Sequence, residues 1–266
     1  LNKASKKHSI NAHKDWNNLL EDEKVKGIIL ATPPEPRFKL AYEALKAGKH
    51  LLLEKPVALK ADEVAELHRL AIEQRLSVGV DFEYRAVPLF MQAKRLIKKG
   101  LIGEPWLIKL DWLMSSRANQ SRPWDWYSDS RKGGGVLGAL GTHAFDMIHW
   151  LLGPTESISA QLSTSIKERI EPNSKQTRKV TSEDIALGQL TVKGLESDFT
   201  IPAQITLSAV TRQGRGCWIE IYGSKGTLIL GSENQKDYVH GFGLWYAKEG
   251  EQPKSISPDK DLKFSK

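Results

Sequence analysis

A lysine and a histidine are the two side chains of this 266-residue sequence best suited to proton chemistry. Lys55 stands between Glu54 and Pro56, directly after an apolar run of strand length. A lysine at the end of a strand can donate a proton, clamp a substrate or act as an acid with a lowered pKa. The alternative is an exposed lysine without a role, and the local sequence leaves both interpretations open.

His143 lies in a second cluster of polar residues and glycines. It follows Gly141 and Thr142, and the apolar residues after it predict a helix near residues 141–152. We therefore expect His143 in the first turn, where the helix dipole disfavours imidazolium and keeps the ring a neutral base. Asp146, three residues later, would either hold the imidazole or cap the helix. A histidine that only caps or packs against the helix is the alternative.

Three successive glycines, residues 133–135, precede this histidine. Glycines permit backbone conformations that are closed to other residues and let another molecule approach closely. A flexible linker is the alternative, but the apolar helix that follows favours a tight entry. Cys217 is the only cysteine and is expected to be a buried structural thiol. Histidines and carboxylates do not occur at metal-ligand spacings, so we expect no metal.

Alternating strands and helices are expected to position Lys55. Residues 26–31, 49–53 and 76–80 read as strands, and the stretches between them have helical period. This β-α-β-α-β order predicts a parallel sheet with right-handed crossovers. Ligands bind beyond the carboxyl ends of such strands, where Thr32 and Pro33 follow one strand and Glu54 and Lys55 follow the next.

The pattern changes after residue 86. A helix is expected between Pro88 and Gly100, and then strand-like runs dominate, at residues 106–114, 157–164, 185–192, 201–210, 217–222 and 227–230. Such a series predicts a mostly antiparallel sheet. The expected fold class is therefore α/β plus α+β, with an incomplete Rossmann domain at 1–85 and an α+β domain at 86–266. Residues 169–179 are expected to form an exposed loop, and residues 252–266 have no periodicity.

Composition places the chain among ordinary globular proteins. It has 40% hydrophobic and 27% charged residues and no apolar run of membrane-spanning length, which excludes disordered, membrane-spanning and disulfide-built classes. The net charge of +7 is dispersed and lacks interleaved aromatics, so we expect neither nucleic acid nor membrane as a partner. One cysteine and no signal-peptide core favour a reducing, cytoplasmic location.

Four motifs, taken in order, resemble the Gfo/Idh/MocA family of oxidoreductases. They are residues 31–33, residues 47–56, residues 133–146 and residues 221–227. The resemblance covers nearly the whole chain. It implies a Rossmann domain that binds NAD or NADP, an α+β domain whose open sheet makes a homo-oligomer contact, and a sugar, cyclitol or related polyol as substrate.

The resemblance also implies roles for individual residues. Lys55 matches a lysine that contacts the reacting oxygen and the nicotinamide, and His143 matches the histidine that takes the hydroxyl proton while the hydride leaves. Thr32, Pro33 and Glu54 match positions that line the cofactor. The residues expected to line the substrate pocket are Tyr84, Arg85, Trp126, Arg131 and Asp146.

Two departures from the family pattern bear on activity. Ala139 stands where the family has an aspartate four residues before the histidine. The glycine-rich G-x-G-x-x-G loop that holds a pyrophosphate does not occur before Thr32, and residues 1–8 resemble the end of the family's second helix. We therefore expect the first β-α-β segment to be missing. A non-catalytic binding or scaffold protein that kept the fold is the alternative function.

Overall fold

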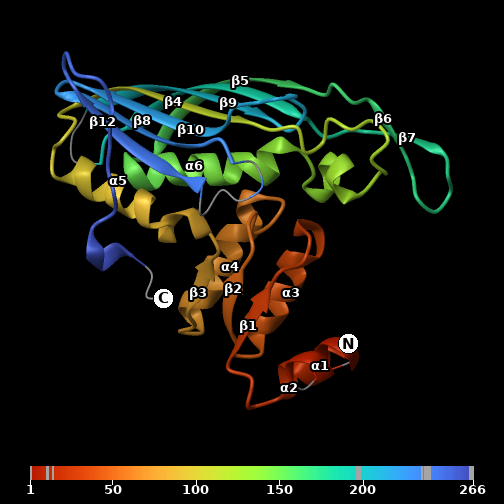
Figure 1. Cartoon of the computed structure of the whole chain (residues 1–266). Coiled ribbons are helices and arrows are strands. Elements are labelled where there is room, and N and C mark those ends of the chain that lie inside the picture. Colours follow the sequence, from red (N-terminus) through yellow and green to blue (C-terminus); the bar gives the residue numbers. More distant parts are fainter. Residues whose placement is uncertain are drawn as a thin grey trace. The chain divides into compact units, whose positions relative to one another are not determined.

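The chain forms two compact units, Leu1–Asp81 and Phe82–Lys266, and each has its own hydrophobic core. The computed structural model describes residues 2–9, 12–13, 15–195, 199–234, 236 and 241–263. Among these residues no helix has the length and the apolar composition that crossing a lipid bilayer requires. Figure 1 shows the elements of both units.

The first unit contains a parallel sheet with strand order β1-β2-β3. Its strands are β1 (Gly27–Leu30), β2 (His50–Leu53) and β3 (Val78–Val80), and its helices are α1 (Asn2–His8), α2 (Trp16–Glu21), α3 (Pro34–Lys46) and α4 (Ala61–Glu73). Because α3 joins β1 to β2 and α4 joins β2 to β3, the predicted β-α-β-α-β order and the parallel sheet are confirmed.

One face of this sheet carries the core of the first unit. Ile28 and Leu51 are buried with Ala41 and Leu45 of α3, whereas Ile29, on the opposite face, is 71% exposed. Alternate residues of a strand point to opposite faces, which explains this pattern. The helices α3 and α4 also contact each other. Because β1 and β2 are parallel neighbours, the loops that follow them lie at the same carboxyl edge of the sheet.

The second unit contains an eight-stranded sheet with the order β13-β12-β11-β10-β4-β9-β8-β5. Neighbouring strands are antiparallel except β4 and β9, which are parallel, so the predicted mostly antiparallel sheet is confirmed. The strands are β4 (Pro105–Leu113), β5 (Thr155–Ser163), β8 (Ile185–Lys193), β9 (Thr200–Ser208), β10 (Gly216–Gly223), β11 (Gly226–Ser232), β12 (Gly243–Lys248) and β13 (Lys254–Ser255).

Two helices, α5 (Pro88–Lys98) and α6 (Thr142–Leu151), run along one face of this sheet (Figure 1). The core between them contains Phe90 of α5, Trp112 of β4 and Met147 of α6, each at most 2% exposed. A short 3-10 helix, η1 (Glu83–Ala86), precedes α5 and contacts α6. This packing places η1 and the start of α6 side by side.

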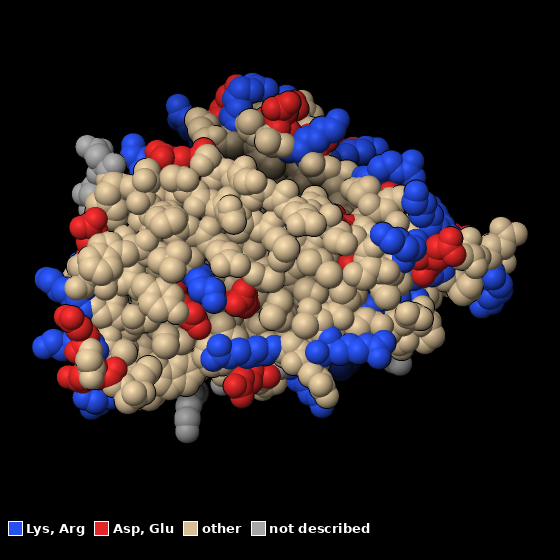
Figure 2. Space-filling view, turned by 90° about the horizontal axis from the view of Figure 1, so that it is seen from above, with Lys and Arg blue, Asp and Glu red and all other residues tan. Residues whose placement is uncertain are grey.

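The opposite face of the sheet is turned away from α5 and α6 and is largely uncharged (Figure 2). Leu107 and Leu187 point to it, because their neighbours Ile108 and Ala186 are buried in the core. Charged side chains on the two central strands β4 and β10 include Lys109, Asp111 and Glu220. The face is therefore flat and only sparsely charged.

Residues 169–179 do not form the exposed loop that their polar composition predicted. The strands β6 (Glu168–Ile170) and β7 (Thr177–Lys179) pair as a hairpin. Arg169 is only 5% exposed, and its guanidinium donates hydrogen bonds to the carbonyl oxygens of Asn119, Arg122 and Arg117. The expectation was wrong at the two ends of the segment, which pair as strands, whereas residues 172–176 between them are exposed. Arg169 can be buried because its guanidinium donors are paired.

The C-terminal stretch also has more structure than its lack of periodicity indicated. Besides β13 it contains the 3-10 helix η5 (Lys260–Leu262), and Ile256 packs against the core. Arg95 of α5 forms ion pairs at 2.7 Å with Asp259 and with Asp261. These contacts depend on residues distant in the sequence, so no local pattern reveals them. The strand β12 was not among the predicted strands. Of the C-terminal stretch, residues 264–266 lie outside the described residues.

Candidate functional site

Two loops at the carboxyl edge of the parallel sheet carry the residues predicted to bind a cofactor. Thr32 and Pro33 follow β1, and Glu54 and Lys55 follow β2. The Glu54 carboxylate accepts a hydrogen bond of 3.0 Å from the backbone N–H of Lys55. Lys55 itself is half-buried. The structure thus brings the predicted residues of the first unit together at one edge.

Arg37 of α3 ties these two loops to each other. Its guanidinium donates a 2.8 Å hydrogen bond to the carbonyl oxygen of Glu54 and further hydrogen bonds to the carbonyl oxygens of Thr32 and Pro56. The residue is 2% exposed, and burial lowers its pKa while the charge of Glu54 raises it. Sequence reasoning missed Arg37. The available signal was its helical spacing, which puts a charge on the same buried face as Ala41.

The Thr32 hydroxyl is buried and has no hydrogen-bond partner within the described part of the chain. A hydroxyl can both donate and accept, so a buried one without a partner costs free energy unless a ligand or water pairs with it. A ribose hydroxyl has the complementary capacity. The residues at this edge therefore fit the sugar part of a nucleotide.

In the second unit, His143 of α6 is enclosed by aromatic rings. It is 4% exposed, and the ring of Tyr84 meets it edge-on with centroids 4.9 Å apart. The rings of Phe82 and Trp112 lie at 5.9 and 6.1 Å. The Nε2 atom is 3.7 Å from a carboxylate oxygen of Glu83 in η1. A buried imidazole with a neighbouring carboxylate can accept a proton.

His143 is the second residue of α6, as predicted, but the helical segment that contains it begins before α6, which weakens the expected influence of the helix dipole on the ring. A π-helical turn, Leu137–Gly141, runs directly into α6, and its own N-cap, Val136, already has helical backbone angles. The dipole acts mainly within the first turn. No local pattern predicts this turn, because glycines at 138 and 141 indicate an interruption of the helix rather than its continuation.

Asp146 does not hold the imidazole, contrary to one of the two predicted roles. Both of its carboxylate oxygens accept hydrogen bonds from the Arg85 guanidinium, one of them from Nε at 2.9 Å. Asp146 is 8% exposed, and its hydrogen bond raises the pKa of Arg85. A bidentate pair of this geometry is among the stronger hydrogen-bonding arrangements. It connects η1 to α6 one turn beyond His143.

The other two predicted pocket residues have different contacts. The Trp126 ring is 37% exposed and packs against the ring of Tyr127. Arg131 is exposed and pairs with Asp129 at 3.3 Å, which lowers the pKa of that carboxyl. The structure therefore groups Tyr84, Arg85 and Asp146 with His143, and it places Trp126 and Arg131 in a separate loop of the second unit.

The glycine run forms a tight entry to the helical segment, as its composition favoured. A Cβ atom at Gly134 would lie 2.2 Å from the carbonyl oxygen of Tyr127. Gly133 and Gly135 have φ angles of +75° and +106°, which side chains disfavour. Cys217 is fully buried, and burial raises the pKa of its thiol. The structural interpretation of this cysteine is confirmed.

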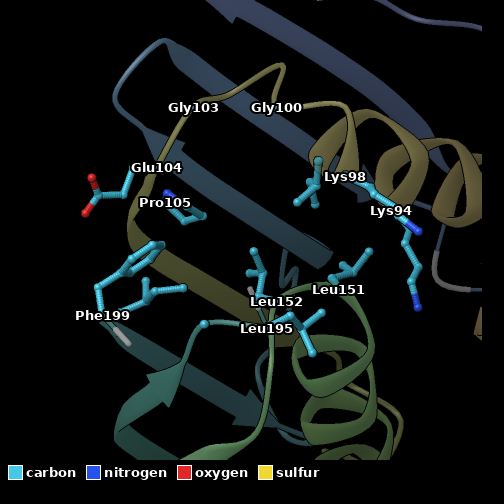
Figure 3. Close-up of a pocket in the computed structure, with 13 residues that line it drawn as sticks. Lys94, Lys98, Gly100, Gly103, Glu104, Pro105, Leu151, Leu152, Leu195 and Phe199 are labelled. Carbon is cyan, nitrogen blue, oxygen red and sulfur yellow. The ribbon is translucent and has the colours of Figure 1, made fainter. Parts of the chain in front are cut away.

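A cavity of about 410 Å³ lies elsewhere in the second unit, between α5, the end of α6 and the start of β4 (Figure 3). Leu151, Leu152 and Phe199 line it, together with the chains of Lys94 and Lys98. None of the residues predicted for the site contributes to its lining. We therefore do not place the chemistry in this cavity.

Comparison with known proteins assigns both units to one family. Residues 1–82 match the description "Oxidoreductase family, NAD-binding Rossmann fold", and residues 90–229 match "GFO/IDH/MocA C-terminal domain". An uncharacterized oxidoreductase of Synechocystis sp. is 43% identical over 256 residues, which are 96% of this chain and 68% of that protein. The levoglucosan dehydrogenase of Pseudarthrobacter phenanthrenivorans is 32% identical over 160 residues, 60% of this chain and 41% of that protein.

Solved structures show the same fold. An oxidoreductase domain protein from Kribbella flavida superposes with a TM-score of 0.84 at 27% identity, covering 96% of this chain and 68% of its own. A levoglucosan dehydrogenase in complex with NADH and L-sorbose has a TM-score of 0.84 at 23% identity, covering 96% of this chain and 67% of its own. The chain thus spans about two thirds of the length of the Synechocystis protein and of these two solved structures, whereas the sequence match to the levoglucosan dehydrogenase of P. phenanthrenivorans covers 41% of that protein.

Proposed function

The chain belongs to the Gfo/Idh/MocA family of NAD-binding oxidoreductases, and from this premise we propose what it does. The proposed reaction is hydride transfer between a nicotinamide cofactor, NAD or NADP, and a hydroxyl-bearing carbon of a sugar, cyclitol or related polyol. The dehydrogenase names and the NADH-bound structures among the relatives support this class of reaction.

The arrangement at the carboxyl edge of the first unit's sheet carries the proposal. This edge is where nucleotides bind in open parallel sheets. There, Arg37 holds the loop of Thr32 and the loop of Glu54 in one arrangement, and the buried Thr32 hydroxyl has the capacity to pair with a ribose hydroxyl. The bound nicotinamide supplies the hydride acceptor or donor, and residues of this chain position it.

Two side chains are assigned to the proton and charge changes. In the direction of oxidation, His143 takes the proton of the substrate hydroxyl as general base. The Lys55 ammonium donates to the same oxygen and stabilises the negative charge that develops on it. Tyr84, Arg85 and Asp146, which the structure groups near His143, are assigned to the substrate pocket. Trp126 and Arg131, in a separate loop of the second unit, are assigned to it as well.

The division of labour between the two units is part of the same proposal. The first unit, residues 1–81, acts as the cofactor-binding domain, and the second unit, residues 82–266, acts as the substrate and oligomerisation domain. The sparsely charged outer face of the large sheet suits contact with a second copy of the chain (Figure 2). The buried, reduced Cys217 fits a cytoplasmic setting.

Cofactor binding and turnover are tested separately. Titration of the protein with NADH and NADPH should quench the fluorescence of its eight tryptophans, and a polyol panel followed by absorbance of the reduced cofactor should reveal turnover. Lys55→Met and His143→Asn should each lose at least about 100-fold in turnover. The exposed Lys39 and His68 provide matched controls, Lys39→Met and His68→Asn, which should keep parental rates.

Two outcomes would overturn the proposal. Absence of quenching by either nucleotide would favour a non-catalytic binding or scaffold protein with this fold. Turnover that survives in Lys55→Met and in His143→Asn would remove both residues from the reaction.

A further inference from the structure

The surroundings of His143 disfavour a positive charge on its ring. A neutral imidazole that accepts a proton becomes a cation, and burying a cation costs several kcal/mol unless an opposite charge compensates it. Because the ring is only 4% exposed, solvent can hardly stabilise a positive charge on it, and the neighbouring rings of Tyr84, Phe82 and Trp112 are uncharged. Any general-base role therefore requires a carboxylate nearby.

Two carboxylates come from the elements packed around His143, and they differ in the contacts that they make. Asp146 lies on the same helix, but the Arg85 guanidinium engages both of its oxygens, so its charge is already compensated. Glu83 comes from η1, and its Oε1 atom is 3.7 Å from His143 Nε2. This is an ion-pair distance, slightly longer than a hydrogen bond. The other titratable or charged groups on the elements around the ring are Tyr84 and Arg85 on η1, His149 on α6, Lys94, Arg95 and Lys98 on α5, and Lys109 and Asp111 on β4.

We propose that Glu83 is the positioning carboxylate of His143: it orients the ring through Nε2 and stabilises the imidazolium that forms when the ring takes the substrate proton. This inference rests on the general-base role assigned to His143 above. It deepens that role by naming the charge that makes it possible.

The backbone around Glu83 supports this assignment. η1 spans only Glu83–Ala86, and the Arg85–Asp146 pair fixes it against α6 two residues after Glu83. The Glu83 side chain is 46% exposed, so its carboxylate stays hydrated while it reaches the buried ring. A half-exposed carboxylate keeps its charge without a large desolvation penalty. Glu83 can therefore keep a negative charge near the ring without the desolvation free energy that a fully buried carboxylate would require.

A direct test follows the titration of the His143 ring by NMR, independently of cofactor and substrate. His143→Asn assigns the resonance among the seven histidines. In Glu83→Gln the titration midpoint of this ring should fall by about half a pH unit to one pH unit, because a partly exposed partner within 4 Å favours the cation. Glu83→Asp keeps the charge and should recover most of the parental midpoint. Glu156→Gln, at an exposed position of β5, is the control and should leave it unchanged.

Kinetics supply the second readout. Glu83→Gln should lower turnover roughly tenfold, as loss of a group that orients a reactive imidazole does. In the direction of oxidation, the acid limb of its pH–rate profile should move to lower pH by the same amount as the NMR midpoint, with the KM for the oxidised cofactor unchanged.

The outcomes separate the two proposals. An unmoved NMR midpoint in Glu83→Gln, or an equal shift in Glu83→Asp and Glu83→Gln, would overturn the role of Glu83. A shifted midpoint together with undiminished turnover in His143→Asn would overturn the function proposed for His143 and leave the pairing intact.

Discussion

Replacing Arg37 by methionine should loosen the carboxyl edge of the first unit. The substitution keeps most of the aliphatic volume of the side chain and removes the donors to the carbonyl oxygens of Thr32, Glu54 and Pro56. Each hydrogen bond from a charged group contributes roughly 1.5–3 kcal/mol. The desolvation of the charged guanidinium on folding offsets several kcal/mol of the summed contribution of these hydrogen bonds. We therefore expect the unfolding free energy of this unit to fall by about 3 kcal/mol.

Hydrogen exchange measured residue by residue is the appropriate assay, because the chain has two cores and global unfolding need not be two-state. Amides of β1 and β2 should lose protection in Arg37→Met, and amides of β4 and β10 should not. NADH should also bind more weakly. Arg69→Met, at an exposed arginine of α4 that pairs with Glu73, is the control, with an expected loss below about 0.5 kcal/mol. Equal protection in Arg37→Met and Arg69→Met would refute the assigned role.

Two further predictions concern the second unit. Burial lowers the pKa of His149, whose Nε2 accepts a 3.1 Å hydrogen bond from the Thr155 N–H, so the unfolded chain binds a proton at this residue more readily than the folded chain. The unfolding free energy should therefore fall as the pH drops below about 6.5, by at most about 1.4 kcal/mol per pH unit. His149→Gln should flatten this dependence in urea titrations at pH 7.5 and 5.5, and an unchanged slope would contradict it. Gly134→Ala should lower the unfolding free energy by about 2–4 kcal/mol, because the new Cβ would meet the Tyr127 carbonyl. Gly188→Ala, whose Cβ would have no heavy atom nearer than 3.8 Å, is the control and should change it by no more than about 0.5 kcal/mol. Equal melting temperatures of the two variants would show that the entry to the helical segment tolerates a side chain.

Local patterns predicted the regular elements well, and the reason is periodicity. The strands β1, β2 and β4 are buried on alternate positions, and α3 and α5 begin at prolines and end before glycines with positive φ. Such signals depend on neighbours in the sequence. For the second unit, the sequence predicted a mostly antiparallel sheet but not the order of its strands. Its strand order, with β4 between β9 and β10, depends on pairings that no local window contains.

The site was predicted less completely than the fold, because its contacts join distant segments. Arg37 reaches a carbonyl 19 residues away, and Arg85 reaches a carboxylate 61 residues away. Glu83 and His143 are likewise far apart in the sequence. Sequence spacing suggested Asp146 as the partner of His143, since it lies one turn along the helix. Competition by Arg85 for that carboxylate is visible only in the folded chain.

The position of β4 in the large sheet has a consequence for synthesis of the chain. Its two neighbours, β9 and β10, begin only at Thr200 and Gly216, whereas the strands of the first unit pair with the next strand along the chain. As the chain emerges from the ribosome, both edges of β4 remain unpaired until β9 and β10 have been synthesised. Strands in that state pair readily with other chains. Until β10 has been synthesised, the open edges of β4 are therefore the part of this sheet most exposed to pairing with another chain.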